Sequence, residues 1–322
     1  MKSVAVVIPA LNEAEHIQSN LMVIIDALRE VSGVRFTLMV VDDGSTDATA
    51  DRVRACREQS AETADVDIHL LSLNRHFGKE AAIAAGLQAC RYQDAVVVMD
   101  SDLQHPPAMI PQMIAHWQNG MQVVEAVKSS RGNETRTRGL LVRGYYVMFN
   151  YLTRLSISDH TDFKLLDREV VEACISLPEH GRFFRGLVKW MDFPSHQLFF
   201  DVPESTRKRS AWGSGALFRY AIDSITSFTA FPLQIVTLLG GLTFLLSVII
   251  GAMALYDKIT GTAIDGFTTV ILLILLIGSV LMFSVGLIGI YIGRIYDEVK
   301  RRPNYLVNQR RSTVSLPQRE RE

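Results

Sequence analysis

The sequence predicts an α/β domain built on a mostly parallel sheet, followed by an amphipathic helix and a hairpin of two transmembrane helices. Strand and helix patterns alternate with short links in the first 212 residues. Four polar clusters follow the four strands that these patterns predict. Two uncharged apolar runs of membrane length come later, so the expected segments are 1–212, 213–231, 232–293 and 294–322.

Four buried strands are predicted from apolar, β-branched runs, at residues 3–10, 36–44, 68–73 and 94–100. Helices are predicted between them, at residues 12–31, 45–59 and 79–90. Ser45 or Thr46 is the expected N-cap of the second helix. Strands that alternate with helices form a parallel sheet, and such a sheet binds ligands at the carboxyl ends of its strands.

The composition narrows the classes of function. Lysine plus arginine (33) nearly balance aspartate plus glutamate (34), whereas a protein that binds nucleic acid usually carries a basic surplus. Cys56, Cys90 and Cys174 lie far apart, which predicts reduced, buried thiols and neither a zinc site nor a disulfide. The apolar run near the N-terminus meets Pro9 without a cleavage site, so we expect a strand and not a signal peptide.

The four polar clusters fall where the predicted strands end. They are PALNE at 9–13, DDGS at 42–45, NRHFGKE at 74–80 and DSD at 100–102. Each cluster alone also fits a plain structural role: a capping turn for DDGS, a loop of solvated charges for NRHFGKE, and a solvated acidic turn for DSD. Four clusters at one edge of a single sheet predict a binding site.

The residue types in these clusters suit an anionic, metal-bound ligand. An aspartate of DDGS can accept a hydrogen bond from a nucleobase or a ribose, and Arg75 and Lys79 flank a glycine in a way that suits a phosphate. Asp100 and Asp102 repel each other unless a cation lies between them. Mg²⁺ or Mn²⁺ takes carboxylate oxygens and keeps positions for substrate phosphates. The sequence has neither GxxxxGK[ST] nor GxGxxG, the fingerprints of ATP hydrolysis and nicotinamide chemistry.

Two apolar runs, at 233–255 and about 268–292, are each long enough to cross a bilayer as a helix. A buried hairpin of a soluble protein is the alternative, but uncharged runs of this length are rare in soluble cores. Basic residues crowd the last segment, whereas the linker holds only Lys258, so the first domain and the C-terminus are expected on the cytoplasmic side of a bacterial inner membrane. The basic tail is expected to touch anionic headgroups. Residues 213–231 would lie in the membrane interface or pack on the first domain.

Seven stretches carry a resemblance to a known family. They are VVIPALNEAEHI, VVDDGSTDAT, LNRHFGKEAAIAAGL, MDSDLQHPP, TDFKLLDREVV, SFTAFPLQI and GLIGIYIGRIYDEVKRRPNYLV, and they cover nearly the whole chain in the family's order. The sequence resembles family-2 glycosyltransferases of the GT-A fold, and among them polyprenyl-phosphate glycosyltransferases such as bactoprenol glucosyltransferases and dolichol-phosphate mannose synthase. The resemblance implies a GT-A domain that transfers a sugar with inversion from a nucleotide diphosphate sugar, with UDP as the expected nucleotide.

The resemblance also implies roles at matching positions. The nucleotide-sugar pocket is expected to be lined by Pro9, Asn12, Glu13, Asp42, Asp43, Lys79, Asp100 and Arg131. Asp100 and Asp102 match a DxD pair that holds Mg²⁺ or Mn²⁺, with Asp102 as the direct ligand and a catalytic residue. Asp162 matches an aspartate at the reacting centre. A phosphate acceptor is already largely ionised, since its second pKa is about 6, so Asp162 is expected to orient the donor sugar or the attack rather than remove a proton.

One position departs from the family's pattern. Ala211 stands where the family commonly has a lysine that meets the acceptor phosphate. The acceptor phosphate is therefore expected to meet other residues, namely Arg207, Lys208, Arg209, Ser210 and Arg182, with Arg185 as a further candidate. Alternatively, the three basic residues before Ser210 face only lipid headgroups.

The leading interpretation is a membrane-anchored enzyme that moves a hexose, glucose by default, from a UDP-sugar to undecaprenyl phosphate, for glycan or lipopolysaccharide modification. Other sugars on the same carrier stay open: 4-amino- or formamido-arabinose, mannose and N-acetylhexosamine. A processive polysaccharide synthase is a second interpretation. The absence of a QxxRW motif from the sequence argues against it. A catalytically inactive nucleotide-sugar-binding scaffold is the third, favoured by Ala211 and disfavoured by the intact aspartates. Pairing of the hairpins in the membrane would give a homo-oligomer.

Overall fold

The computed structural model describes residues 1–60, 66–128, 160–177, 179, 183–201, 231–260 and 266–314. The chain forms two units, one of Met1–Ala211 with Pro303–Glu322 and the other of Trp212–Arg302. The residues after 302 therefore belong with the first unit, although a long stretch of the second unit precedes them in the sequence.

A seven-stranded sheet forms the centre of the first unit. Its strands are β1 (Lys2–Ala10), β2 (Val34–Asp42), β3 (Val66–Ser72), β4 (Ala95–Val98), β5 (Val123–Lys128), β6 (His160–Asp167) and β7 (Ser195–Phe200). Their order across the sheet is β3-β2-β1-β4-β6-β5-β7. Of these strands β6 alone runs antiparallel to its neighbours, β4 and β5. The predicted α/β fold with a mostly parallel sheet is confirmed.

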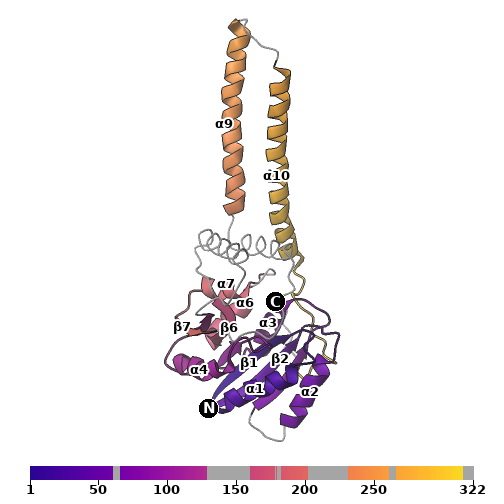
Figure 1. Cartoon of the computed structure of the whole chain (residues 1–322), viewed down its shortest axis with the longest axis vertical. Coiled ribbons are helices and arrows are strands. Elements are labelled where there is room, and N and C mark those ends of the chain that lie inside the picture. The colour runs from indigo at the N-terminus through magenta and orange to yellow at the C-terminus, as the bar shows by residue number, and fades with distance from the viewer. Residues whose placement is uncertain are drawn as a thin grey trace. The chain divides into compact units, whose positions relative to one another are not determined.

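Helices cover both faces of this sheet (Figure 1). They are α1 (Ile17–Arg29), α2 (Thr49–Ser60), α3 (Lys79–Ala89), a 3-10 turn η1 (Pro107–Met109), α4 (Ile110–Gln118), α6 (Arg168–Ser176) and α7 (Phe184–Trp190). Apolar residues of α1, α2 and α4 pack on one face, and those of α3, α6 and α7 on the other. Residues 4–8 of β1 are completely buried between the two layers, and each large aliphatic side chain buried in this way contributes about 1.5–3 kcal/mol.

The start of α2 corrects one expectation. The helix begins at Thr49 and not at residue 45, so Ser45 and Thr46 do not cap it. The backbone N–H of Ser45 instead donates to Asp42 Oδ1 at 3.0 Å. Asp47 Oδ1 accepts from the backbone N–H of Thr49 at 3.0 Å, so an aspartate satisfies a donor that the first turn of the helix leaves unpaired.

Residues 306–313 lie along the outer edge of β3 and of the two residues that follow it. The backbone N–H groups of Asn308 and Thr313 donate to Ser72 O and Leu70 O, each at 2.8 Å. The side chains of Ser312 and Thr313 accept from Ser72 N and Leu70 N, at 2.9 and 2.8 Å. The segment expected as one basic tail, 294–322, is therefore divided. Its residues up to 300 belong to α10 (Phe267–Lys300), and residues 306–313 cover a sheet edge whose backbone groups would otherwise be unpaired.

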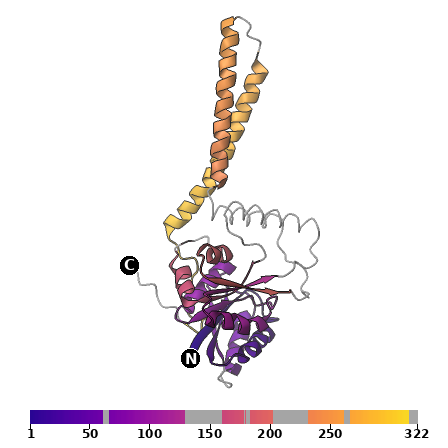
Figure 2. The ribbon, with the colours of Figure 1, turned by 90° about the vertical axis from the view of Figure 1, so that its left-hand side faces the viewer.

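The second unit contains two long helices, α9 (Phe231–Thr260) and α10, which run side by side in both views (Figures 1 and 2). The segment Leu276–Lys300 contains an 18-residue window with a mean hydropathy of 2.1, and the segment is long and apolar enough to cross a membrane. Val236–Ile250 in α9 is a shorter apolar segment. A second span stays a prediction. Of the helix expected at 213–231, residues 213–230 lie outside the described residues, and residue 231 is the first of α9.

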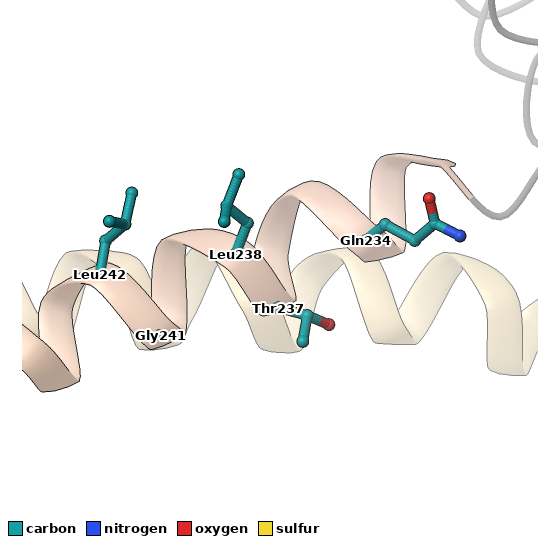
Figure 3. A pocket seen from close by; sticks show the side chains of 5 residues that line it. All are labelled: Gln234, Thr237, Leu238, Gly241 and Leu242. Carbon is teal, nitrogen blue, oxygen red and sulfur yellow. The ribbon is translucent and has the colours of Figure 1, made fainter.

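A shallow hollow of about 490 Å³ lies on one side of α9 (Figure 3). Its lining consists of Gln234, Thr237, Leu238, Gly241 and Leu242. Figure 3 shows Leu238 and Leu242 extending from the same side of the helix. Gly241 adds no side chain to the lining. None of the polar clusters contributes to this hollow, so it is a property of one helix surface.

The loops after β2 and β3 pack closely against each other at Gly44. Its φ is +71°, and a Cβ atom there would lie 2.3 Å from the backbone carbon of Arg75. Gly33 has a similar φ of +77° with nothing within 4 Å of its Cβ position. We expect Gly33→Ala to lower the free energy of unfolding by about 1 kcal/mol, and Gly44→Ala to lower it by at least about 2 kcal/mol more. Urea unfolding in detergent measures both, and equal losses would contradict the close packing.

Candidate active site

The centre of the candidate site is a buried carboxylate, Asp162 on β6, of which 3% is exposed. Its Oδ1 accepts from Arg185 Nε at 2.6 Å, and its Oδ2 accepts from Arg185 Nη2 at 2.9 Å and from Lys79 Nζ at 2.6 Å. Burial alone would raise the pKa of Asp162, but the hydrogen bonds and charges of Arg185 and Lys79 hold that pKa well below its usual range. Asp162 is therefore an anion near neutral pH.

The antiparallel course of β6 brings Asp162 to this place. Val98, the last residue of β4, pairs with Lys164 of β6, so Asp162 lies two residues further, beyond the end of β4 and level with Asp100. Lys79, the first residue of α3, bridges the two carboxylates, with Nζ 2.5 Å from Asp100 Oδ1. A single lysine thus neutralises two aspartates from different strands.

The DxD pair is set by a turn and not by a strand. β4 ends at Val98, two residues before the expected position. Asp102 Oδ1 accepts from the backbone N–H of Gln104 at 3.1 Å, and Leu103 has a φ of 57°. Strand alternation therefore does not set the directions of Asp100 and Asp102, because β4 ends before the chain reaches them.

The oxygens available at this turn fit a hard divalent cation that arrives with further ligands. Asp100 and Asp102 are both partly exposed and offer the carboxylate oxygens that Mg²⁺ and Mn²⁺ prefer. In the described part of the chain, no group of three or more His, Cys, Asp or Glu side chains is arranged for a metal ion. Two carboxylates suit a cation that keeps water and diphosphate oxygens in its other positions. Lys79 contacts Oδ1 of Asp100, so a cation and Lys79 would compete for that oxygen.

Asp43 holds the loop that leads into α3. Its Oδ1 accepts from the backbone N–H of Phe77 at 2.8 Å, and its Oδ2 accepts from the backbone N–H of Gly78 at 2.9 Å. His76 Nδ1 lies 2.7 Å from the same Oδ2. Because these contacts fix the backbone just before Lys79, Asp43 positions the lysine that bridges Asp100 and Asp162. The predicted contact of Asp43 with a nucleotide stays a prediction.

Asp42 is completely buried. Its Oδ1 accepts from Ser45 N, while its Oδ2 has no hydrogen-bond partner among the residues that the structure describes. Asp42 thus offers an unsatisfied acceptor without an exposed surface, and a nucleobase N–H could reach it only if the DDGS turn opened.

The PALNE loop is joined to the DDGS turn. Asn12 has a φ of 53°, its N–H donates to Ser45 Oγ at 2.9 Å, and its Oδ1 accepts from the backbone N–H of Thr46 at 2.9 Å. The N–H of Glu13 donates to Thr49 Oγ1 at 2.8 Å. The structure therefore brings the clusters after β1 and β2 together as predicted, whereas Pro9 is buried within β1.

Sequence reasoning missed a second ion pair on β6. Lys164 Nζ lies 2.5 Å from Glu125 Oε1, and the two side chains are 0% and 1% exposed. Burial lowers the pKa of Lys164, and the charge of Glu125 opposes that lowering. Lys164 and Asp162 share one face of the strand because they are two residues apart, and that alternation in TDFKLLD was the available signal.

Several predicted residues lie outside the described part of the chain. They are Arg131, Arg182, Arg207, Lys208, Arg209 and Ser210. Arg185, the further candidate for the acceptor phosphate, is described and is bound to Asp162. Arg185 would therefore have to bind the acceptor phosphate while it stays paired with Asp162.

Known proteins resemble this chain in sequence and in fold. Residues 5–175 match the family model described as Glycosyl transferase family 2. An uncharacterized glycosyltransferase, sll0501, of Synechocystis sp. is 33% identical over 316 residues, which are 98% of this chain and 97% of the relative. A bactoprenol glucosyl transferase of Shigella phage SfX is 34% identical over 270 residues, 83% of this chain and 87% of the relative. Glucosyl-3-phosphoglycerate synthase from Mycobacterium tuberculosis, solved with Mn²⁺, UDP and glucosyl-3-phosphoglycerate, is 26% identical with a TM-score of 0.44, over 70% of this chain and 79% of that one.

The lowered pKa of Asp162 predicts a specific loss of stability in acid. A depressed native pKa contributes stability above the unfolded value of about 3.9, and this is lost as the pH falls toward the native value. Below pH 4 the wild type should therefore lose about 1.4 kcal/mol per pH unit more than Asp162→Asn. Melting temperatures between pH 7 and 3 measure the difference. Asp26→Asn, at an exposed ion pair with Arg29, is the control; wild-type and Asp162→Asn curves that run parallel would contradict the prediction.

Proposed function

Because this chain belongs to Glycosyl transferase family 2, we propose that it transfers glucose from UDP-glucose to a polyprenyl phosphate. The observation that carries the proposal is the anion Asp162, held between Lys79 and Arg185 beside the DxD turn. The bactoprenol glucosyl transferase, which aligns with most of this chain, supports glucose as the sugar and a polyprenyl phosphate as the acceptor. The proposal includes the cytoplasmic face of a bacterial inner membrane as the place of reaction, as the distribution of basic residues predicts.

The reaction is a single displacement at the anomeric carbon. An oxygen of the acceptor phosphate forms a bond to that carbon while the bond to the diphosphate breaks, and UDP leaves with the electron pair. The acceptor oxygen needs no base, since the second pKa of a phosphate is about 6. Asp162 is itself bound by two cations, so its task is to orient the donor sugar, and the main barrier is the approach of two anions.

Cations around the reacting centre lower this barrier. Lys79 and Arg185 are the described residues that place positive charge beside Asp162. A Mg²⁺ or Mn²⁺ ion held by Asp100 and Asp102 would supply charge to the leaving diphosphate. Lys79, which stays bound to Asp162, is proposed to face a donor phosphate as well. Arg131 is proposed for the donor, and the acceptor phosphate is assigned to Arg207, Lys208, Arg209, Ser210 and Arg182.

A labelling experiment tests the proposed function. Membranes that contain the protein are incubated with labelled UDP-glucose and undecaprenyl phosphate, and the lipid extract is separated by chromatography. A labelled lipid that mild acid cleaves is expected, and it would supply a glucosyl group to cell-envelope glycans or lipopolysaccharide. Polymer would indicate a processive synthase, no product with any sugar nucleotide would indicate an inactive scaffold, and product with another sugar alone would correct the donor.

The proposed metal site predicts a large effect of Asp102→Ala. We expect the rate of lipid glucosylation to fall by about 10²-fold or more, because the variant loses a direct ligand of the ion that neutralises the leaving group. Asp51→Ala removes an exposed aspartate of α2 and serves as the control. Rates are measured over a range of Mn²⁺ concentrations. Full activity of Asp102→Ala at every concentration would rule out the metal role of this residue.

A further inference from the structure

Glu80 connects two helices of the candidate site. It is the second residue of α3, and its Oε2 accepts from the backbone N–H of Phe184 at 2.8 Å. Phe184 is the first residue of α7 and Arg185 is the second. Each helix thus contributes two consecutive residues, of which one binds Asp162 and the other joins the helices.

These contacts close a ring. Lys79 binds Asp162, Asp162 binds Arg185, and Arg185 follows Phe184, whose N–H donates to Glu80, the neighbour of Lys79. Because the ring is closed, the position of Arg185 is fixed from two sides, by its own ion pair and by the backbone of its helix.

The hydrogen bond from Phe184 is the one that α7 needs at its start. The first N–H groups of a helix have no partner within the helix, and the N-cap residue, Phe183, makes no capping hydrogen bond through its side chain. A helix of seven residues is too short to be stable by its own hydrogen bonds. Glu80 therefore supplies from another helix the cap that the sequence around α7 lacks.

The surroundings of Glu80 do not favour a negative charge. Burial and, second to it, the charge of Asp162 raise the pKa of Glu80 to about 7, against the opposing effects of the Phe184 N–H and of the charges of Lys79 and Arg185. A neutral side chain of the same length would avoid the repulsion from Asp162, so the feature of Glu80 that the structure uses is its acceptor oxygen and not its charge.

We propose that Glu80 is a positioning residue, which fixes the first turn of α7 and thereby holds the Arg185 guanidinium on both oxygens of Asp162. Its effect on sugar transfer rests on the proposed function, whereas its effect on α7 does not. Without the acceptor at residue 80, the first turn of α7 would open and Arg185 would leave Asp162 with only one of its cations.

Three substitutions of Glu80 distinguish the effect of its side-chain length from the effect of its charge. Glu80→Gln keeps the length and an oxygen acceptor but removes the charge; Glu80→Asp keeps the charge but is shorter by one methylene; Glu80→Ala removes both. Glu172→Ala, at an exposed position of α6, is the matched control. Hydrogen–deuterium exchange of peptides that contain residues 184–190 reports on α7 without any turnover.

We expect Glu80→Ala and Glu80→Asp to speed exchange in α7, and Glu80→Gln to stay close to the wild type. In the labelling assay, Glu80→Ala should lower kcat by about 10- to 100-fold and change the KM for UDP-glucose by less than about 3-fold, because Asp162 is misplaced in the transition state more than the nucleotide is. Glu80→Gln should restore most of kcat.

Two results would overturn the inference. One is wild-type exchange in α7 of Glu80→Ala, and the other is rescue by Glu80→Asp but not by Glu80→Gln, which would assign the effect to charge. A wild-type enzyme that glucosylates no lipid would instead contradict the proposed function, and the exchange measurement would still decide the role of Glu80 in holding α7.

Discussion

The compensation of one buried charge organises the catalytic half of this protein. Asp162 keeps its negative charge in the interior because Lys79 and Arg185 donate to both of its oxygens. Breaking a buried ion pair by removing one partner typically destabilises a protein by about 3–5 kcal/mol. The starts of α3 and α7 and the turn after β4 must therefore all lie where these side chains can meet β6. The fold and the proposed chemistry share this constraint, since we propose that the same charges neutralise the reacting anions.

The loops around this centre hold one another. Asn12 joins the loop after β1 to the turn after β2, and Asp43 in that turn holds the backbone of the loop after β3. Gly44 allows the close approach because no side chain separates it from the backbone of Arg75. Several polar residues that looked like ligand contacts thus have a first task inside the protein, which is to place Lys79.

The first half of the sheet was predictable because strands buried on both faces read as continuous apolar runs. Prediction failed where side chains say little about the backbone. β4 ends at Val98 although Met99 continues the apolar run, and Asp47, not Ser45 or Thr46, serves the start of α2. Asp162 was found through the family resemblance, while its partner Arg185 was expected at the acceptor. Glu80 left no signal, because its partner is a backbone N–H 104 residues away. The edge pairing of residues 306–313 combines backbone groups, which any sequence has, with the hydroxyl groups of Ser312 and Thr313, whose pairing with a distant strand no local pattern indicates.

That edge pairing has a consequence for synthesis on the ribosome. The backbone N–H of Ser72 donates to the hydroxyl group of Ser312, which is synthesised 240 residues later. At roughly 5–20 residues per second, the delay is about 10–50 s. During this interval both hydrophobic helices emerge from the ribosome while the outer edge of β3 is still open. The catalytic unit is translated almost entirely before α9 and α10, yet the edge of its sheet is completed only after them, so this last step of its folding cannot occur until both helices have been made.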